Sequence, residues 1–216
     1  YNDAVHKAKE PIPKSKDLEV FIGIDFGLTP AAIFGQRTAR NRWFLIHELV
    51  CTDMGIKKFS ELLKSEIATL FPQASQKITL IGDPAGDFRA QTDKTTPFQI
   101  MRAAGLQARP APTNDVVIRT ESVNSVLNRM IDGKSGVLID PSCKILLRGF
   151  DGGYCYRRIN VVGDKYDEKP DKNKYSHIHD ALQYMFLGAG EGKSLLKQHK
   201  PTQTAVVMSH YCPTPT

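Results

Sequence analysis

Two apolar segments that each end in a single aspartate most restrict the folds open to this chain. Glu19–Ile24 leads into Asp25 in the string FIGIDFG, and Lys77–Ile81 leads to Asp83 in TLIGDPAG. Short apolar runs bounded by glycine and proline are typical of buried strands. An aspartate directly after such a strand lies at the edge of a sheet, where a ligand can reach it. Asp-Pro is also a common way to begin a turn, so each aspartate taken alone has a purely structural interpretation too.

The pattern around these two segments predicts an α/β domain with a mixed sheet. Two further strands follow the first one closely, which indicates an antiparallel meander. Apolar residues at helical spacing then predict a helix from Ile56 that Pro72 ends, and later segments alternate between short strands and helices. The order resembles that of the RNase H-like fold: a mixed central sheet, flanking helices and an insertion before a C-terminal helix. Thr96 is expected to cap a helix at 98–104, with Pro97 at the first helical position. The remaining expected elements are strands at 31–36, 43–50 and 107–111, helices at 116–130 and 176–187, one or two β-hairpins at 136–162, and a charged loop at 164–174.

In this topology the first and fourth strands are neighbours, so Asp25 and Asp83 are expected to converge. Two carboxylates held close together repel, and each raises the pKa of the other unless a cation compensates. Hard divalent cations with oxygen ligands provide that compensation. Two such ions about 3.5–4 Å apart can stabilise the attacking and leaving oxygens of phosphodiester hydrolysis. The pair of aspartates therefore makes a metal-dependent reaction on a phosphate the first hypothesis.

A third carboxylate, Asp180, lies in the segment YSHIHDALQYMFL. The apolar stripe of the expected helix runs through its other side, so periodicity predicts that Asp180 is exposed to solvent. His177 and Tyr184 share the face of Asp180. His177 and His179 point in different directions and cannot easily bind one ion together, so His179 is expected to be structural.

Charge and cysteine content exclude several classes of protein. The chain has 29 basic and 23 acidic residues, a net charge of +6, which permits a polyanionic partner without requiring one. Its four cysteines form no CxxC pair, which argues against a zinc site or a disulfide framework and fits a reducing compartment. No apolar run approaches the roughly 18 residues of a membrane span. The polar ends divide the chain into a linker at 1–17, a domain at 18–190 and a flexible tail at 191–216.

Three segments in order resemble the nuclease domain of the large terminase subunit, the DNA-packaging motor of tailed bacteriophages. They are IGIDFGLTPAAIFGQ, GDPAGDFRAQTDKTTPFQIMRAAGL and the pattern His177-x-x-Asp180-Ala-Leu-x-Tyr184. The stretch CKILLRGFDGGYCYR also resembles the insertion before the last helix of that family. The resemblance implies an RNase H-like nuclease that cuts double-stranded viral DNA during packaging. It assigns catalysis and the binding of Mg²⁺ or Mn²⁺, as two ions, to Asp25, Asp83 and Asp180, with His177 and Asp87 beside the ligands.

The family resemblance also implies partners and a location. Large terminases carry an N-terminal ATPase domain and work with a small subunit and a portal in the host bacterial cytoplasm. No phosphate-binding loop of the GxxxxGK[ST] type is present here, because the glycines of GAGEGKS at 188–194 are too close together. This fits an isolated nuclease half, expected to be monomeric, with residues 1–17 as the remnant of the interdomain linker.

Contacts to double-stranded DNA are expected from basic side chains outside the acidic triad. Basic residues on a hairpin suit phosphate contacts that do not depend on sequence, although they can also simply cover a solvated strand face. The candidates are Lys144, Arg148, Arg157 and Arg158 on the expected hairpin and Arg89 and Lys94 on the loop after Asp83.

Three alternatives remain open at this stage. IGIDFG resembles a phosphate loop of actin- and Hsp70-type ATPases, but those proteins need two such domains and far more than 216 residues. A Holliday-junction resolvase would use the same chemistry on a four-way junction. A DNA-binding module without catalysis would bind DNA in the absence of metal and leave it uncut.

Overall fold

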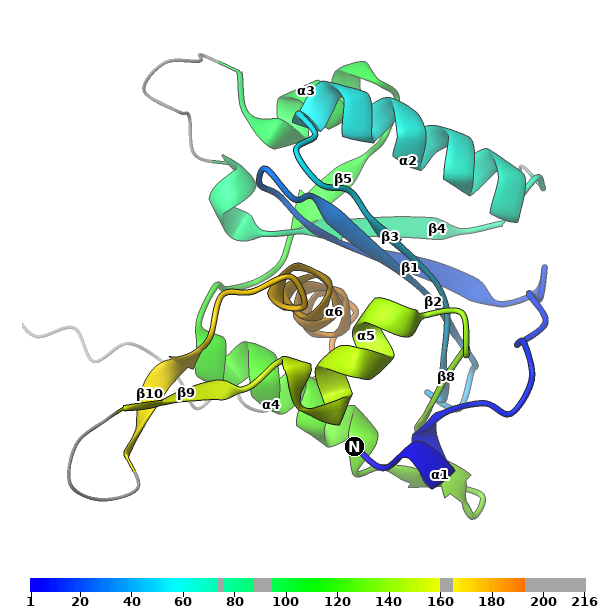
Figure 1. Ribbon diagram of the computed structural model, residues 1–216. Helices are drawn as coiled ribbons and strands as arrows, with labels where there is room; N and C mark the ends of the chain where they lie inside the picture. The colour runs from blue at the N-terminus through cyan, green and yellow to red at the C-terminus, as the bar shows by residue number, and fades with distance from the viewer. Residues whose placement is uncertain (74–75, 88–94, 160–164, 193–216) are drawn as a thin grey trace, which may run out of the picture.

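A six-stranded mixed sheet with the strand order β5-β4-β1-β2-β3-β8 forms the centre of the molecule. The computed structural model describes residues 1–73, 76–87, 95–159 and 165–192 (Figure 1). The strands β1 (Glu19–Asp25), β2 (Ala31–Arg37) and β3 (Trp43–Val50) form the expected antiparallel meander. β4 (Ile78–Gly82) pairs in parallel with β1, which confirms that the first and fourth long strands are neighbours. The edges are β5 (Ala108–Pro110), parallel to β4, and β8 (Val137–Ile139), parallel to β3.

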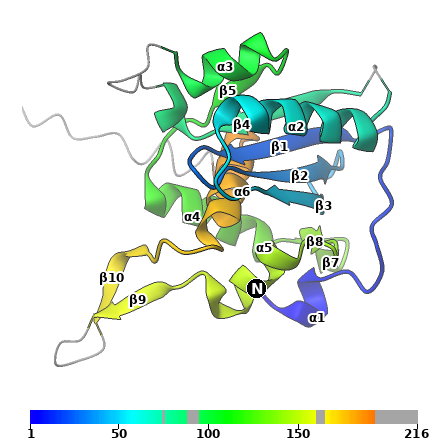
Figure 2. The ribbon, with the colours of Figure 1, turned by 45° about the horizontal axis from the view of Figure 1, so that its top comes forward.

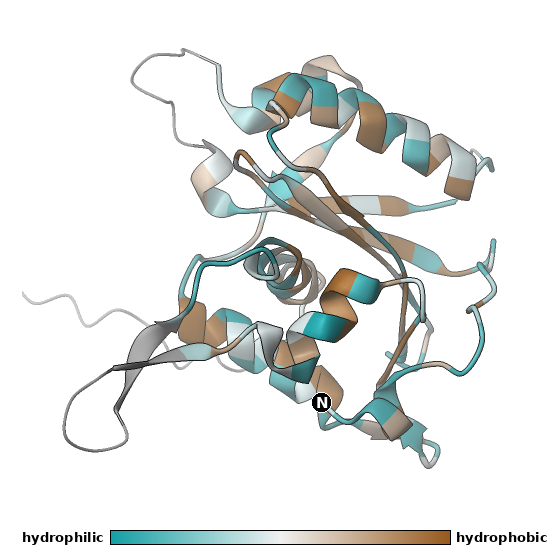
Figure 3. Cartoon of the chain, viewed as in Figure 1, coloured by the Kyte–Doolittle hydropathy of each residue, from teal (hydrophilic) through white to brown (hydrophobic). Residues whose placement is uncertain are grey.

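Helices cover both faces of this sheet, as Figures 1 and 2 show. One face packs against α2 (Ile56–Leu70) and α3 (Pro97–Ala103). The other packs against α4 (Val116–Leu127), α5 (Lys144–Arg148) and α6 (Ser176–Gly188). The central strands are coloured mostly as hydrophobic in Figure 3, as expected for a sheet buried on both faces. The mixed α/β class predicted from the sequence is therefore confirmed.

The central helix α6 lies unusually close to the sheet because glycine occupies the contact positions on the strands. A Cβ atom on Gly23 of β1 would lie 2.0 Å from the carbonyl oxygen of Ala181, and one on Gly35 of β2 would lie 2.9 Å from Cε of Met185. A larger residue at either position would push the helix away. The two glycines thus set the depth at which α6 presents its side chains beside the end of β1.

The segment 136–162, expected to be one or two β-hairpins, is mostly something else. It begins with β8, continues as α5 and the π-helical turn η2 (Gly149–Gly153), and only then enters β9 (Tyr156–Ile159). The start of α5 is capped from a distance: Glu48 of β3 accepts hydrogen bonds from the backbone N–H groups of Ile145 and Leu146, at 2.7 and 2.9 Å. Local sequence could not reveal a cap from almost a hundred residues away.

Two neighbouring expectations also need correction. The expected charged loop at 164–174 contains β10 (Lys165–Pro170), which pairs antiparallel with β9. The helix expected to reach Met130 ends at Leu127, and Met130 belongs to the small hairpin of β6 (Met130–Ile131) and β7 (Lys134–Ser135). By contrast, the predicted start of α3 is confirmed, since Thr96 and Gln99 form a reciprocal capping box.

The N-terminal segment packs against the domain. It contains the short helix α1 (Asp3–His6), and the buried His6 ring lies with Nε2 3.0 Å from the carbonyl oxygen of Leu127. The N–H of Ile12 donates to the carboxylate of Asp140 at 2.6 Å. The role of residues 1–17 as a linker, and the boundaries at 18 and 190, remain predictions. Among the residues that the structure describes, no helix has the length and apolar character needed to cross a bilayer.

Candidate functional site

Three carboxylates come together from three neighbouring elements. Asp25 ends β1, Asp83 directly follows β4, and Asp180 lies in the second turn of α6. The N–H of Asp83 donates to the carbonyl oxygen of Ile24 at 3.1 Å, which fixes it beside the end of β1. Burial raises the pKa of Tyr184 on α6, and the negative charges of all three aspartates raise it further. The backbone contact of Asp83 with the end of β1, and the contact of Asp25 with His177 one turn before Asp180, bring the three carboxylates to the same end of the sheet.

Asp25 is buried and contacts a histidine of α6. Its Oδ2 lies 2.9 Å from Nδ1 of His177, one turn before Asp180 on α6. Burial raises the pKa of the Asp25 carboxyl, the hydrogen bond to His177 opposes the rise, and the charge of Asp180 adds to it. The sequence placed His177 on the face of Asp180, and in the structure its ring contacts Asp25.

The expectation that Asp180 is exposed is wrong, since only 2 % of the residue is accessible to solvent. Every residue of α6 from Ile178 to Leu187 is buried, because the helix runs between the sheet and α4. The polar side of the helical wheel therefore faces other parts of the protein instead of water. A helix buried all round cannot be oriented from its apolar stripe alone.

Two basic side chains that the sequence analysis did not single out neutralise Asp180. Nη1 of Arg119 on α4 lies 3.3 Å from Oδ1, and Nζ of Lys172, in the segment between β10 and α6, forms an ion pair with Oδ2. The guanidinium of Arg119 also lies 4.7 Å from the ring centre of Tyr184. Arg119 sits on the apolar stripe of its helix between Val116 and Val123, which is a signal in the sequence. Lys172 has no comparable signal.

The donor chemistry of this cluster suits a hard divalent cation, although its present conformation does not bind one. Three carboxylates around one region, one of them with a raised pKa, are typical of sites for oxygen-seeking cations. Within the ranges that the structure describes, however, no group of three or more His, Cys, Asp or Glu side chains could hold a metal ion as it lies. Both oxygens of Asp180 are occupied by cationic side chains. The residue types therefore fit a divalent cation, whereas the described side chains, as they lie, are not arranged as a metal site.

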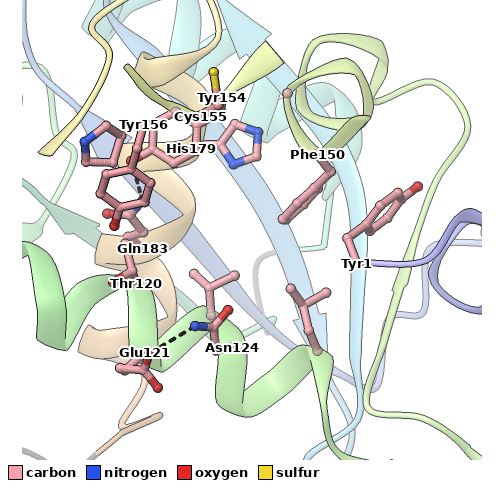
Figure 4. Close-up of a pocket in the computed structure, with 14 residues that line it drawn as sticks. Tyr1, Thr120, Glu121, Asn124, Phe150, Tyr154, Cys155, Tyr156, His179 and Gln183 are labelled. Carbon is pink, nitrogen blue, oxygen red and sulfur yellow. Dashed lines mark hydrogen bonds between the residues drawn. The ribbon is translucent and has the colours of Figure 1, made fainter. Parts of the chain in front are cut away.

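His179 belongs to a separate cavity of about 310 Å³ between α4, η2 and α6 (Figure 4). Its Nε2 lies 3.2 Å from the carbonyl oxygen of Leu146, and its ring stacks on Tyr154 at 4.6 Å. Burial lowers the pKa of His179 to about 4, so the ring is neutral at physiological pH. These contacts agree with the prediction that His179 is structural. Gln183 closes the same cavity by donating to the Tyr154 hydroxyl at 2.9 Å.

The candidate DNA-binding residues fall into three groups. Lys144 and Arg148 are exposed on α5, and with Lys174 they line a cavity of about 350 Å³ that also includes Thr29 and Tyr175. Val50 of this cavity pairs with Ala31, which pairs with Asp25, so the basic cavity lies at the same end of the sheet as Asp25. Of the remaining DNA-binding candidates, Arg157 and Arg158 lie on β9, and Arg89 and Lys94 fall outside the described residues. Asp87, which was predicted to lie beside the metal ligands, is the last residue of η1 (Pro84–Asp87).

Comparison with known proteins finds similarity in structure alone. No family model matches the chain, and no curated protein matches its sequence. The large terminase of a thermophilic bacteriophage superimposes with a TM-score of 0.67 at 18% identity, over 88% of this chain and 43% of the terminase. The nuclease domain of the P22 large terminase gives 0.60 at 18% identity, over 87% of this chain and 89% of that domain. The SPP1 large terminase nuclease domain, solved with bound Mn, gives 0.53 at 17% identity, over 84% and 94%.

These matches identify the fold of the chain. The chain spans less than half the length of the thermophilic phage terminase but nearly the whole of the separate P22 and SPP1 nuclease domains. The chain has the RNase H-like fold of the nuclease domains of bacteriophage large terminases, as its sequence motifs indicated.

Proposed function

We propose that this domain is a metal-dependent endonuclease that cuts concatemeric double-stranded viral DNA during genome packaging. The observation that carries the proposal is the geometry of Asp25, Asp83 and Asp180: Asp83 is hydrogen-bonded to the end of β1, and His177, one turn before Asp180, contacts Asp25. Carboxylates held close together favour the binding of a cation, because its charge compensates their mutual repulsion. The shared fold with terminase nuclease domains supplies the substrate class.

In this proposal the three aspartates hold Mg²⁺ or Mn²⁺, as two ions. Such ions stabilise charge on a phosphate and make a bound water acidic enough to act as a nucleophile at neutral pH. The SPP1 nuclease domain with bound Mn is a precedent within the same fold. His177 keeps the Asp25 carboxylate in a fixed orientation through its Nδ1 contact. Asp87, at the end of η1, remains a candidate for an auxiliary role.

DNA is proposed to approach over the basic cavity at the same end of the sheet as Asp25. Lys144, Arg148 and Lys174 line it, the hydroxyl groups of Thr29 and Thr52 add polar contacts, and none of the described residues around it is acidic. This combination suits phosphate oxygens of the backbone and carries no information about base sequence. The other candidates on the DNA path are Arg157 and Arg158 on β9 and Arg89 and Lys94 after Asp83.

The setting of the reaction is part of the same proposal. By analogy with the thermophilic phage terminase, of which this chain spans 43%, the domain works beside an N-terminal ATPase domain. The small terminase subunit and the portal are the further partners, and the host bacterial cytoplasm is the compartment. The isolated domain is proposed to be a monomer.

Cleavage of supercoiled plasmid DNA tests this function. The domain should convert the plasmid to nicked and linear forms with Mn²⁺ and leave it intact with EDTA. Asp83→Asn should abolish cleavage without unfolding the protein, because it removes a charge at nearly constant volume. Asp53→Asn is the matched control: Asp53 is exposed in the loop after β3, and asparagine tolerates its positive φ of 51°. Cleavage that persists in EDTA or in Asp83→Asn would contradict the proposal, and a strong preference for four-way junctions would favour a resolvase.

A further inference from the structure

The carboxylate of Asp180 already has a cation at each oxygen, and the two cations differ in how firmly they are held. Arg119 has a side chain that is 6 % exposed, and it is fixed by α4 and by its position over the Tyr184 ring. The Lys172 side chain is 71 % exposed and reaches Asp180 with its ammonium group. One partner is thus part of the protein interior, and the other comes in from solvent.

The segment that carries Lys172 is held in place by backbone contacts on both sides. The N–H of Asp171 donates to the carbonyl oxygen of Cys155 at 2.8 Å, and the Asn173 side chain donates to that of Gly153 at 2.8 Å. These bonds connect the segment to the chain around the start of β9. The Lys172 side chain is therefore directed at α6 by its neighbours, while its own length leaves it free to rotate away.

An ammonium group that pairs with a carboxylate oxygen disfavours the binding of a divalent cation at that oxygen. The lysine ammonium and the bound metal ion would lie close together and would repel each other. This repulsion is strong because Asp180 is almost fully buried, where solvent screens charges poorly. A buried carboxylate without a metal nevertheless needs positive charge nearby. Lys172 meets that need, and its exposed position lets it leave.

We propose that Lys172 is a built-in competitor of the metal: it neutralises Asp180 in the metal-free protein and must be displaced before a divalent ion binds there. The inference rests on the proposed function, because it takes Asp180 as a metal ligand. Arg119 keeps its place in both states and orients Asp180.

Opposite effects on stability and on metal affinity distinguish this role from a purely structural one. Lys172→Ala should lower the melting temperature in EDTA, because Asp180 loses one of its two cations. The same variant should bind Mn²⁺ at least about fivefold more tightly, since the ion no longer competes with the ammonium group. Adding Mn²⁺ should therefore recover the lost thermal stability. Loss of a residue that only supports the fold would lower the melting temperature and the Mn²⁺ affinity together.

The experiment measures Mn²⁺ affinity by titration calorimetry, and melting temperature with and without Mn²⁺, on the whole chain without DNA. Lys174→Ala is the matched control: it removes one positive charge two residues away, from a side chain that lies over the Tyr175 ring at 5.1 Å. Its Mn²⁺ affinity should stay within about twofold of the unaltered chain. Lys172→Arg keeps a positive charge that can reach Asp180, so its Mn²⁺ affinity should stay as weak as that of the unaltered chain.

The outcomes separate the inference from the function on which it rests. If Lys172→Ala binds Mn²⁺ no more tightly than the unaltered chain, or if Lys174→Ala gains as much, the inference is overturned and the metal site stands. If neither the unaltered chain nor Lys172→Ala binds Mn²⁺, or if Asp180→Asn binds it equally well, the metal site is wrong and the inference is wrong with it.

Discussion

The two faces of the central sheet are packed with different types of buried residue. On the α2 and α3 face, aliphatic and aromatic residues fill the space, and the buried polar groups of those helices, Ser60 and Thr96, bond to nearby backbone. On the α4 and α6 face the buried residues include two carboxylates, an arginine, a histidine and an amide. These are Asp25, Asp180, Arg119, His179 and Gln183.

This difference indicates what each face contributes. Apolar packing stabilises a fold without demanding particular partners, whereas buried charges need specific ones and are unfavourable without them. Alternation along β1 sends Val20, Ile22 and Ile24 to the apolar face and Asp25 to the other. One face therefore anchors the domain, and the opposite face carries the proposed chemistry.

The largest expected effect comes from a matched pair of core deletions, one on each face. Phe59 on α2 and Phe186 on α6 are both fully or almost fully buried. Phe59→Ala and Phe186→Ala should each lower the free energy of unfolding by about 3–5 kcal/mol. Phe186→Ala alone should also weaken Mn²⁺ binding, because it loosens the helix that carries Asp180. Denaturant unfolding and calorimetry check both, and equal losses of Mn²⁺ affinity would contradict the division between faces.

The second-largest expected effect is a pH dependence of stability that is caused by His179. Its pKa is about 4 in the folded protein, and the unfolded chain has the ordinary value near 6.5. Between these values the unfolded state binds the proton and the folded state does not, so stability should fall by about 3 kcal/mol as pH drops from 6.5 to 4. His179→Gln should remove this slope.

His47 provides the comparison on the apolar face. Burial lowers the pKa of His47 as well, but Glu66 opposes the shift and the side chain is 30% exposed. His47→Gln should therefore remove much less of the slope than His179→Gln. Urea unfolding at a series of pH values measures both, and a larger effect at His47 would reverse the comparison.

The smallest expected effect concerns Asp25 without metal. Its folded pKa is raised, so the folded state retains a proton that the unfolded state loses, and stability falls as pH rises above the unfolded value near 3.9. Asp25→Asn should remove this loss and raise the melting temperature in EDTA at pH 7.5. The gain should disappear near pH 3. A lower melting temperature at pH 7.5 would show that the Asp25 charge is already compensated.

Local sequence patterns were sufficient to predict three features of the fold. The meander, the parallel pairing of β1 with β4 and the cap at Thr96 follow from strand periodicity, chain order and a short capping motif. The segment 144–153 was assigned wrongly because its helix start depends on Glu48 of β3. Such a partner cannot be read from neighbouring residues.

The residues of the candidate site also fall into those with a local sequence signal and those that depend on the whole fold. Asp25 and Asp83 were identified because each follows an apolar strand, which is a local signal. Asp180 was found by resemblance, and its exposure was predicted wrongly because burial of α6 on all sides is a property of the whole fold. Lys172 escaped notice since nothing in its own segment marks a lysine that reaches a buried carboxylate.

The central claim is that Asp25, Asp83 and Asp180 form the metal site of a nuclease. The most direct measurement is anomalous X-ray diffraction from crystals of the domain grown with Mn²⁺. We predict manganese between these three carboxylates, with the Lys172 ammonium turned away from Asp180, and no such density in crystals of Asp180→Asn. Manganese bound elsewhere, or none at this position while Lys172 remains paired with Asp180 at saturating Mn²⁺, would contradict the account.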